Sequence, residues 1–178
     1  LMHPAGVLLD GFQRVNEALH RQLEDMTLEE LTREPHPPIG WLAWRLTRVT
    51  DSNIARQSGQ PQLWMATWGT RFNMTPKEGD FGRGQTHTRD QAKAFNPQNP
   101  ELLLAYQDAT YERAKAYLEK LTTADIDREL DEPQYTPVPT LAVRLLSVLE
   151  NCMQNQGQIA YHKACQRVGG WFPAEMRK

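Results

Sequence analysis

The sequence predicts an all-α fold, a four-helix bundle with one long connection between its second and third helices. In four stretches, residues 4–25, 38–58, 100–121 and 140–168, apolar residues recur every three or four positions. No stretch shows the apolar–polar alternation of a strand, and capping residues, prolines or glycines mark most of the predicted helix ends. Four such helices can enclose one apolar core, so we expect residues 1–178 to form a single domain.

The first predicted helix, residues 4–25, carries apolar residues on one face: Val7, Leu8, Phe12, Val15, Leu19 and Leu23. Thr27 and Glu30 then have the spacing of a capping box, which predicts a short helical turn. Prolines at 35, 37 and 38 interrupt the chain because proline has no N–H to donate.

The second predicted helix spans residues 38–58, with Pro38 in its first turn and Gly59 just after its end. Its apolar face comprises Ile39, Leu42, Leu46 and Val49. Residues 60–97 follow as a connection that is longer than most in bundles, which favours a functional or interface role. Within this connection we expect one short helix, around residues 89–95.

Asn99 is the predicted cap of the third helix, residues 100–121, and Pro100 suits its first position. A short helical turn is expected from Thr123, and residues 131–139 are expected to be extended.

The last predicted helix, residues 140–168, begins at the N-cap Thr140 and is expected to end at Gly169-Gly170. One face is apolar: Leu141, Leu145, Val148, Cys152 and Ile159. A polar stripe lies beside it: Asn151, Asn155, Gln158 and His162. Such a stripe either marks the edge of the buried zone or lines a cavity within the bundle.

The amino-acid composition argues against some classes of binding partner. Apolar residues make up 39% of the chain and charged residues 24%, and the formal net charge is −2. These values give no electrostatic case for a nucleic-acid or membrane partner, and no apolar run approaches the roughly 20 residues that span a bilayer. No signal peptide is visible, and Cys152 and Cys165 are too far apart on one helix to form a disulfide. We therefore expect a reduced, cytoplasmic protein.

Three segments resemble the DinB-like superfamily, a group of four-helix proteins that includes thiol S-transferases and mycothiol-dependent maleylpyruvate isomerases. They are IGWLAWRLTRVTDSNIA, LWMATWGTRF and NQGQIAYHKA, and they occur in the family's order. The resemblance implies a homodimer and a divalent metal, such as zinc or nickel, held between the second and last helices. It also implies a low-molecular-weight thiol as a candidate co-substrate.

The resemblance places the family's metal-ligand positions at Arg45, Asn151 and Asn155. Arginine stays protonated and offers no lone pair, and asparagine oxygen is a poor ligand for zinc or nickel. We therefore expect no metal cofactor, and the family's metal-dependent activation of a thiol is not expected here.

These three residues have two interpretations. Arg45 with two amides beside it has the chemistry to bind a carboxylate, a phosphate or a thiolate. Alternatively, the three form an inert, mutually hydrogen-bonded cluster, or Arg45 is merely solvated.

Other candidates have similar pairs of interpretations. His162 is either a general base at the rim of a pocket or a structural hydrogen-bonding residue. Four tryptophans either wall a substrate cleft, with Arg71 clamping an anion, or belong to the core or a dimer interface: Trp41, Trp44, Trp64 and Trp68. Asp51 is expected in a salt bridge or a helix cap.

The function expected from the sequence is therefore that of a metal-free small-molecule-binding or accessory protein that uses the pocket between the helices. The alternative is a divergent transferase or isomerase that acts on a small anionic or thiol-containing substrate through Arg45, Asn151 and Asn155. Catalytic residues, and whether the protein is an enzyme at all, stay open at this point.

Overall fold

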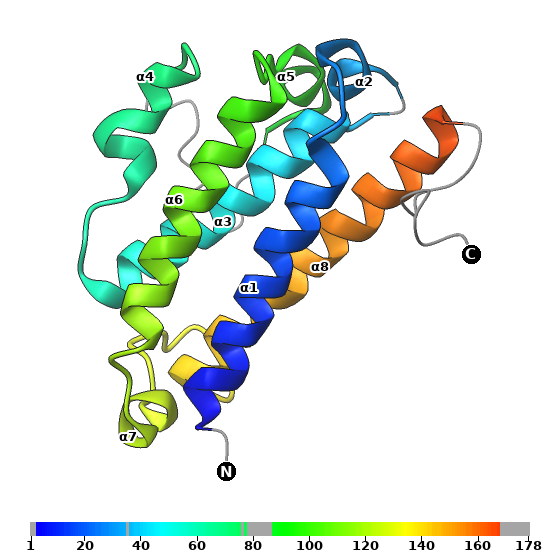
Figure 1. The fold of residues 1–178 in the computed structure, drawn as a ribbon. Helices are drawn as coiled ribbons and strands as arrows, with labels where there is room; N and C mark the ends of the chain where they lie inside the picture. The colour runs from blue at the N-terminus through cyan, green and yellow to red at the C-terminus, as the bar shows by residue number, and fades with distance from the viewer. Residues whose placement is uncertain (1–2, 35, 76, 78–86, 168–178) are drawn as a thin grey trace, which may run out of the picture.

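Four long helices form the body of the computed structural model (Figure 1). They are α1 (Pro4–Leu23), α3 (Ile39–Ser58), α6 (Pro100–Leu118) and α8 (Leu141–Gln166). The structure describes residues 3–34, 36–75, 77 and 87–167. Every named element in these ranges is helical, which confirms the predicted all-α bundle with a long connection between its second and third long helices.

The four long helices pack in a ring rather than in sequence order. Helix α1 packs against α6 and α8, and α3 packs against the same two helices. The helices α1 and α3 therefore lie at diagonal corners, and the long connection joins the neighbours α3 and α6. Because α3 and α8 are neighbours, side chains on their facing sides can meet.

Local sequence signals define most helix ends. The capping box of Thr27 and Glu30 opens α2 (Leu28–Thr32), and Asn99 Oδ1 accepts a hydrogen bond from Leu102 N at 2.8 Å at the start of α6. Thr140 caps α8 in the same way. Gly59 ends α3 with φ of 69°, a left-handed conformation that glycine adopts at little cost.

The long connection contains more helix than the sequence predicts. Besides α5 (Arg89–Ala94), it forms a π-helical turn, η1 (Trp64–Trp68), which runs into α4 (Gly69–Arg71). A tertiary contact starts this turn, because the two carboxylate oxygens of Asp51 on α3 accept hydrogen bonds from Leu63 N at 2.9 Å and Trp64 N at 2.8 Å. Further along, Thr122 and Asp125 form a capping box that opens α7 (Thr123–Asp127).

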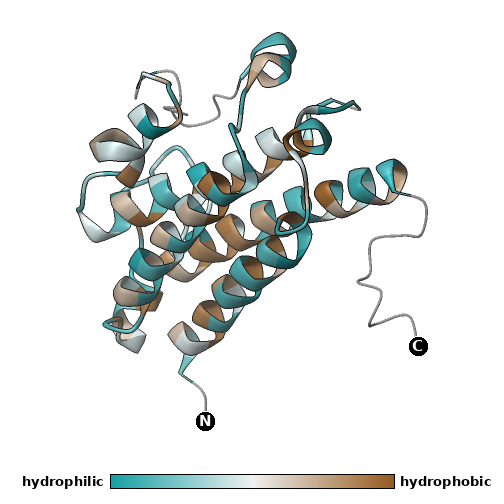
Figure 2. Cartoon of the chain, turned by 45° about the horizontal axis from the view of Figure 1, so that its top comes forward, coloured by the Kyte–Doolittle hydropathy of each residue, from teal (hydrophilic) through white to brown (hydrophobic). Residues whose placement is uncertain are grey.

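The core lies between the long helices, whose hydrophobic sides face inward in Figure 2. Most residues of the predicted apolar faces are buried, but Val49 is only partly buried and Val7 is 56% exposed. It precedes Leu8, and neighbouring residues of a helix point about 100° apart, so only Leu8 reaches the core. The predicted stop at Gly169-Gly170 lies outside the described residues, and α8 ends at Gln166. None of the described helices is both long enough and apolar enough to cross a bilayer.

Candidate functional site

Arg45, Asn151 and Asn155, the positions at which the resemblance implies metal ligands, meet between α3 and α8. Arg45 Nη1 donates a hydrogen bond to Asn155 Oδ1 at 3.4 Å. Asn155 Nδ2 donates to the backbone oxygen of Asn151 at 2.7 Å and to its side-chain oxygen at 3.2 Å. The result is a chain of contacts, in which Asn151 orients Asn155 and Asn155 contacts the guanidinium.

Arg45 is half-buried and forms no ion pair with any residue that the structure describes. Its guanidinium carbon lies 5.6 Å from the centre of the Trp41 ring, one helical turn earlier on α3. Withdrawal from water lowers the pKa of Arg45 below the ordinary arginine value. The cation is therefore partly desolvated with only an amide oxygen and an aromatic face as described partners.

A cavity of about 410 Å³ opens beside this guanidinium. Its described lining comprises His36, Pro37, Trp41, Arg45, His87, Thr88, Arg89 and Ala92. These residues come from the segment before α3, from α3 itself and from the start of α5. The lining so described holds two arginines and two histidines but no acidic residue. Asn151 and Asn155 are not part of it, so they support Arg45 from the side of the bundle.

His87 closes one side of this cavity. Trp41 Nε1 donates a hydrogen bond to His87 Nδ1 at 3.1 Å, so the neutral imidazole carries its proton on Nε2. The imidazole also stacks on Trp44, with the ring centres 5.1 Å apart.

His36 lies on the same cavity with its side chain only 7% exposed. Its Nε2 is 3.2 Å from Glu34 Oε1 without hydrogen-bond geometry, and neither ring nitrogen forms a hydrogen bond with the described residues. The sequence gives no signal that His36 or His87 belongs to a site, because both lie outside the long helices, where helical periodicity does not apply.

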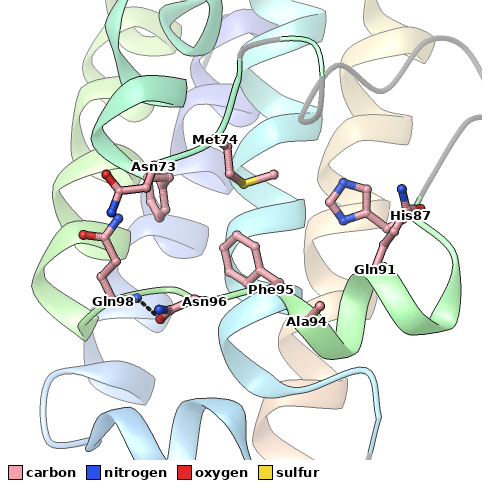
Figure 3. Close-up of a pocket in the computed structure, with 9 residues that line it drawn as sticks. Asn73, Met74, His87, Gln91, Ala94, Phe95, Asn96 and Gln98 are labelled. Carbon is pink, nitrogen blue, oxygen red and sulfur yellow. Dashed lines mark hydrogen bonds between the residues drawn. The ribbon is translucent and has the colours of Figure 1, made fainter.

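A second cavity of about 320 Å³ is also lined by His87 (Figure 3). The close-up shows the side chains of Asn73 and Gln98 near each other at one side, with Phe95 between them and His87. Apart from His87, its described lining is neutral and consists mainly of carboxamides and aromatic or apolar side chains. This cavity therefore lacks the fixed positive charge of its neighbour.

Trp68 and Arg71 lie apart from the Arg45 cavity. The guanidinium of Arg71 is 4.0 Å from the centre of the Trp68 ring, and Trp68 packs against Tyr106 of α6 with ring centres 5.0 Å apart. The structure thus does not bring these two residues into one cleft with Trp41.

His162 is 7% exposed on α8 and lies outside the described lining of the Arg45 cavity. Its Nδ1 has no hydrogen-bond partner among the described residues, and burial lowers the pKa of its imidazole.

Asp51 forms the salt bridge and the helix cap expected from the sequence. Besides capping η1, its Oδ2 lies 3.1 Å from Arg48 Nη1 and accepts a hydrogen bond from the Tyr106 hydroxyl at 2.8 Å. Asp51, Arg48 and Tyr106 are all fully buried, and burial raises the pKa of Tyr106. These contacts stabilise the fold and do not face the Arg45 cavity.

Arg45, Asn151 and Asn155, at which the resemblance implies metal ligands, do not fit a divalent metal. A guanidinium would repel the cation and has no lone pair to donate. The Asn155 amide nitrogen and oxygen already contact Asn151 and Arg45. No group of three histidine, cysteine or acidic side chains that could hold a metal occurs within the described ranges.

The comparisons with known proteins agree with this fold. The structure is similar to the crystal structure of a conserved protein from Enterococcus faecalis, with a TM-score of 0.81 and 24% sequence identity over 92% of this chain and 96% of that one. Among proteins of curated function, none matches the chain. The family model of the DinB superfamily matches residues 11–159, most of the chain. The chain therefore belongs to the DinB superfamily.

Proposed function

We propose that this protein binds a small anionic molecule in the cavity beside Arg45, without a divalent metal. The observation that supports this most directly is the half-buried Arg45, which has no acidic partner among the described residues. A cation withdrawn from water without a counter-ion costs free energy, and an anionic ligand would offset that cost. The described lining of the cavity contains no acidic side chain that would oppose such a ligand, and the Glu34 side chain, which lies 3.2 Å from His36 Nε2, is 76% exposed.

The protonated, buried thiol of Cys152 favours a binding function over a function in which the protein's own cysteine reacts. Cys152 Sγ lies 3.4 Å from Thr50 Oγ1 on the inner side of α8, and burial raises the pKa of its thiol to about 11. Only a thiolate is a strong nucleophile, so Cys152 is not activated near neutral pH. If the protein were instead a divergent transferase or isomerase, Cys152 would not be its nucleophile. The nucleophile or the proton-transfer group would then have to come from the substrate or from the imidazoles of the cavity.

A thermal-shift screen with small carboxylates, inorganic phosphate and low-molecular-weight thiols tests the proposal. An anionic ligand at about one hundred times its dissociation constant should stabilise the native state by roughly 2.7 kcal/mol. Arg45→Ala should abolish the shift, and Arg45→Lys should weaken it because an ammonium cannot bind a carboxylate in a bidentate manner. Arg21→Ala is the matched control, since Arg21 is an exposed arginine of α1.

Two results would contradict the proposal. The first is a shift that survives Arg45→Ala, which would place the ligand elsewhere. The second is one equivalent of tightly bound zinc, nickel or manganese in the purified protein, measured by elemental analysis.

A further inference from the structure

Resting on the proposed function, we infer that the ligand of the Arg45 cavity is a carboxylic acid with a compact apolar or aromatic body, and that His36 is a second residue that binds its carboxylate. This assigns to the cavity a ligand class and a binding residue beyond Arg45.

Two polar side chains of the cavity, Arg45 and His36, can bind a carboxylate. The Arg45 guanidinium is half-buried, and it is oriented by Asn155 at 3.4 Å. The His36 imidazole is more than nine-tenths buried and makes no hydrogen bond with the described residues, although it lines the same cavity. The Glu34 carboxylate lies 3.2 Å from His36 Nε2 without hydrogen-bond geometry, and His36 Nδ1 has no described partner. Buried polar side chains are rarely left without hydrogen bonds, so this imidazole beside a cation without a described counter-ion indicates a ligand with acceptor atoms. A carboxylate has two oxygens and can accept from both.

The rest of the cavity wall is mainly apolar and can contact the body of the ligand. Pro37, Trp41 and Ala92 line it, and Trp41 and Ala92 are buried. Trp41 is fixed by its hydrogen bond to His87, so its ring presents a rigid surface. A bare inorganic anion would leave this surface uncovered, whereas an aromatic or branched body would cover it and gain hydrophobic free energy. The cavity of about 410 Å³ falls within the usual range for small-molecule sites.

The adjoining cavity does not compete for this ligand. Asn73, Gln98 and the other carboxamides that face it carry no charge. They can bind the neutral part of a longer molecule but provide no ion pair for a carboxylate. Variants there serve as controls.

The test is calorimetric titration of four probes: benzoate, its neutral counterpart benzamide, acetate and inorganic phosphate. We expect benzoate to bind at least about tenfold more tightly than the other three, because it alone has both the charge and the apolar body. His36→Phe should weaken benzoate binding about tenfold, as expected for a lost hydrogen bond to a charged group. His36→Asn, whose amide can donate from near the Nδ1 position, should recover most of that loss. Gln98→Ala should leave benzoate binding unchanged.

The results of these titrations distinguish a wrong ligand class, or a wrong role for His36, from failure of the proposed anion-binding function. If acetate or phosphate binds as tightly as benzoate, and Arg45→Ala abolishes the binding, the anion site stands and the ligand class is wrong. If benzoate is preferred but His36→Phe has no effect, the role of His36 is overturned. If no anion binds, if benzamide equals benzoate, or if binding survives Arg45→Ala, the proposed function itself fails.

Discussion

The side chain of Asn155 on α8 accepts a hydrogen bond from the guanidinium of Arg45 on α3 at 3.4 Å. Asn155 is 1% exposed, and its amide nitrogen is held in turn by Asn151. The contact therefore joins two neighbouring helices of the bundle and fixes the orientation of a partly desolvated cation. In this arrangement the asparagine positions Arg45, and Arg45 lines the cavity.

Asn155→Asp should suppress anion binding. The new carboxylate would lie where the amide oxygen now contacts Arg45, and the resulting ion pair would occupy the guanidinium. We expect benzoate affinity to fall at least about tenfold in calorimetric titrations, with a melting temperature close to that of the wild type. Asn155→Ser removes the contact without adding charge and should cost less affinity. Equal affinity of Asn155→Asp and the wild type would show that Arg45 is not the anion-binding group.

Histidines at the three positions where the resemblance implies metal ligands should create a metal site. Asn151 and Asn155 are one helical turn apart on α8, the spacing at which two histidines can bind one zinc ion, and Arg45 contacts Asn155 from α3. The triple variant Arg45→His, Asn151→His and Asn155→His should retain about one equivalent of zinc after gel filtration. Arg45→His alone should retain none. Failure of a folded triple variant to bind zinc would mean that these positions do not correspond to the family's ligands.

The two cysteines should differ in reactivity. Cys152 is fully buried and the pKa of its thiol is about 11, whereas Cys165 is exposed near the end of α8. A disulfide-exchange reagent should therefore titrate one thiol in the native protein at pH 8 and both in denaturant. Cys165→Ser should abolish the native reaction. Rapid native labelling of Cys152 would contradict the inert thiol and reopen nucleophilic chemistry.

Asp51 should be among the most important side chains for stability. It is fully buried, pairs with Arg48, accepts from Tyr106 and caps the first turn of η1. Asp51→Ala leaves the Arg48 cation buried without its acidic partner, and such losses cost about 3–5 kcal/mol. Urea unfolding should show this decrease in the free energy of unfolding. Glu17→Ala, at an exposed position of α1, should change stability by less than about 0.5 kcal/mol. An equally small effect of Asp51→Ala would contradict the role assigned to the network.

The pairing of Glu30 with Arg167 predicts a specific loss of stability in acid. Two charge-assisted hydrogen bonds, of 2.7 and 3.0 Å, lower the pKa of Glu30 to about 2 from an ordinary value of 4.5. The contribution is complete above about pH 4.5 and is lost as the pH falls toward 2, because the unfolded state binds the proton first. Since the pair is partly solvated, we expect about 1 kcal/mol. Urea unfolding of Glu30→Gln between pH 6 and 3 should therefore show a shallower decrease than the wild type, and an identical slope would contradict the pairing.

The long helices could be predicted from the sequence because their signals are local. The apolar residues of α8 recur at helical spacing, and Thr140 supplies the N-cap, so no distant contact is needed to recognise them. The turn η1 could not be predicted, because its first N–H groups bond to Asp51 on another helix. The full burial of Arg48 could not be predicted from the sequence either, because it depends on hydrogen bonds to Asp51, Tyr106 and Gln62, which only the fold brings together.

Some residues of the candidate site could likewise be predicted from the sequence, and others could not. The family resemblance singled out Arg45, Asn151 and Asn155, and the structure brings these three side chains together. His36 and His87 belong to irregular segments, and only the fold reveals that they face the same cavity as Arg45. The sequence leaves open a cleft formed by Trp68 and Arg71 with Trp41, yet the fold places Trp68 against Tyr106 of α6 and Arg71 over the Trp68 ring.

A crystal structure of the protein with benzoate tests the central claim most directly. We predict that the benzoate carboxylate lies within hydrogen-bond distance of the Arg45 guanidinium and the His36 imidazole, with its ring against Trp41. A benzoate bound elsewhere, or an Arg45 side chain turned away from the cavity toward solvent, would contradict the account.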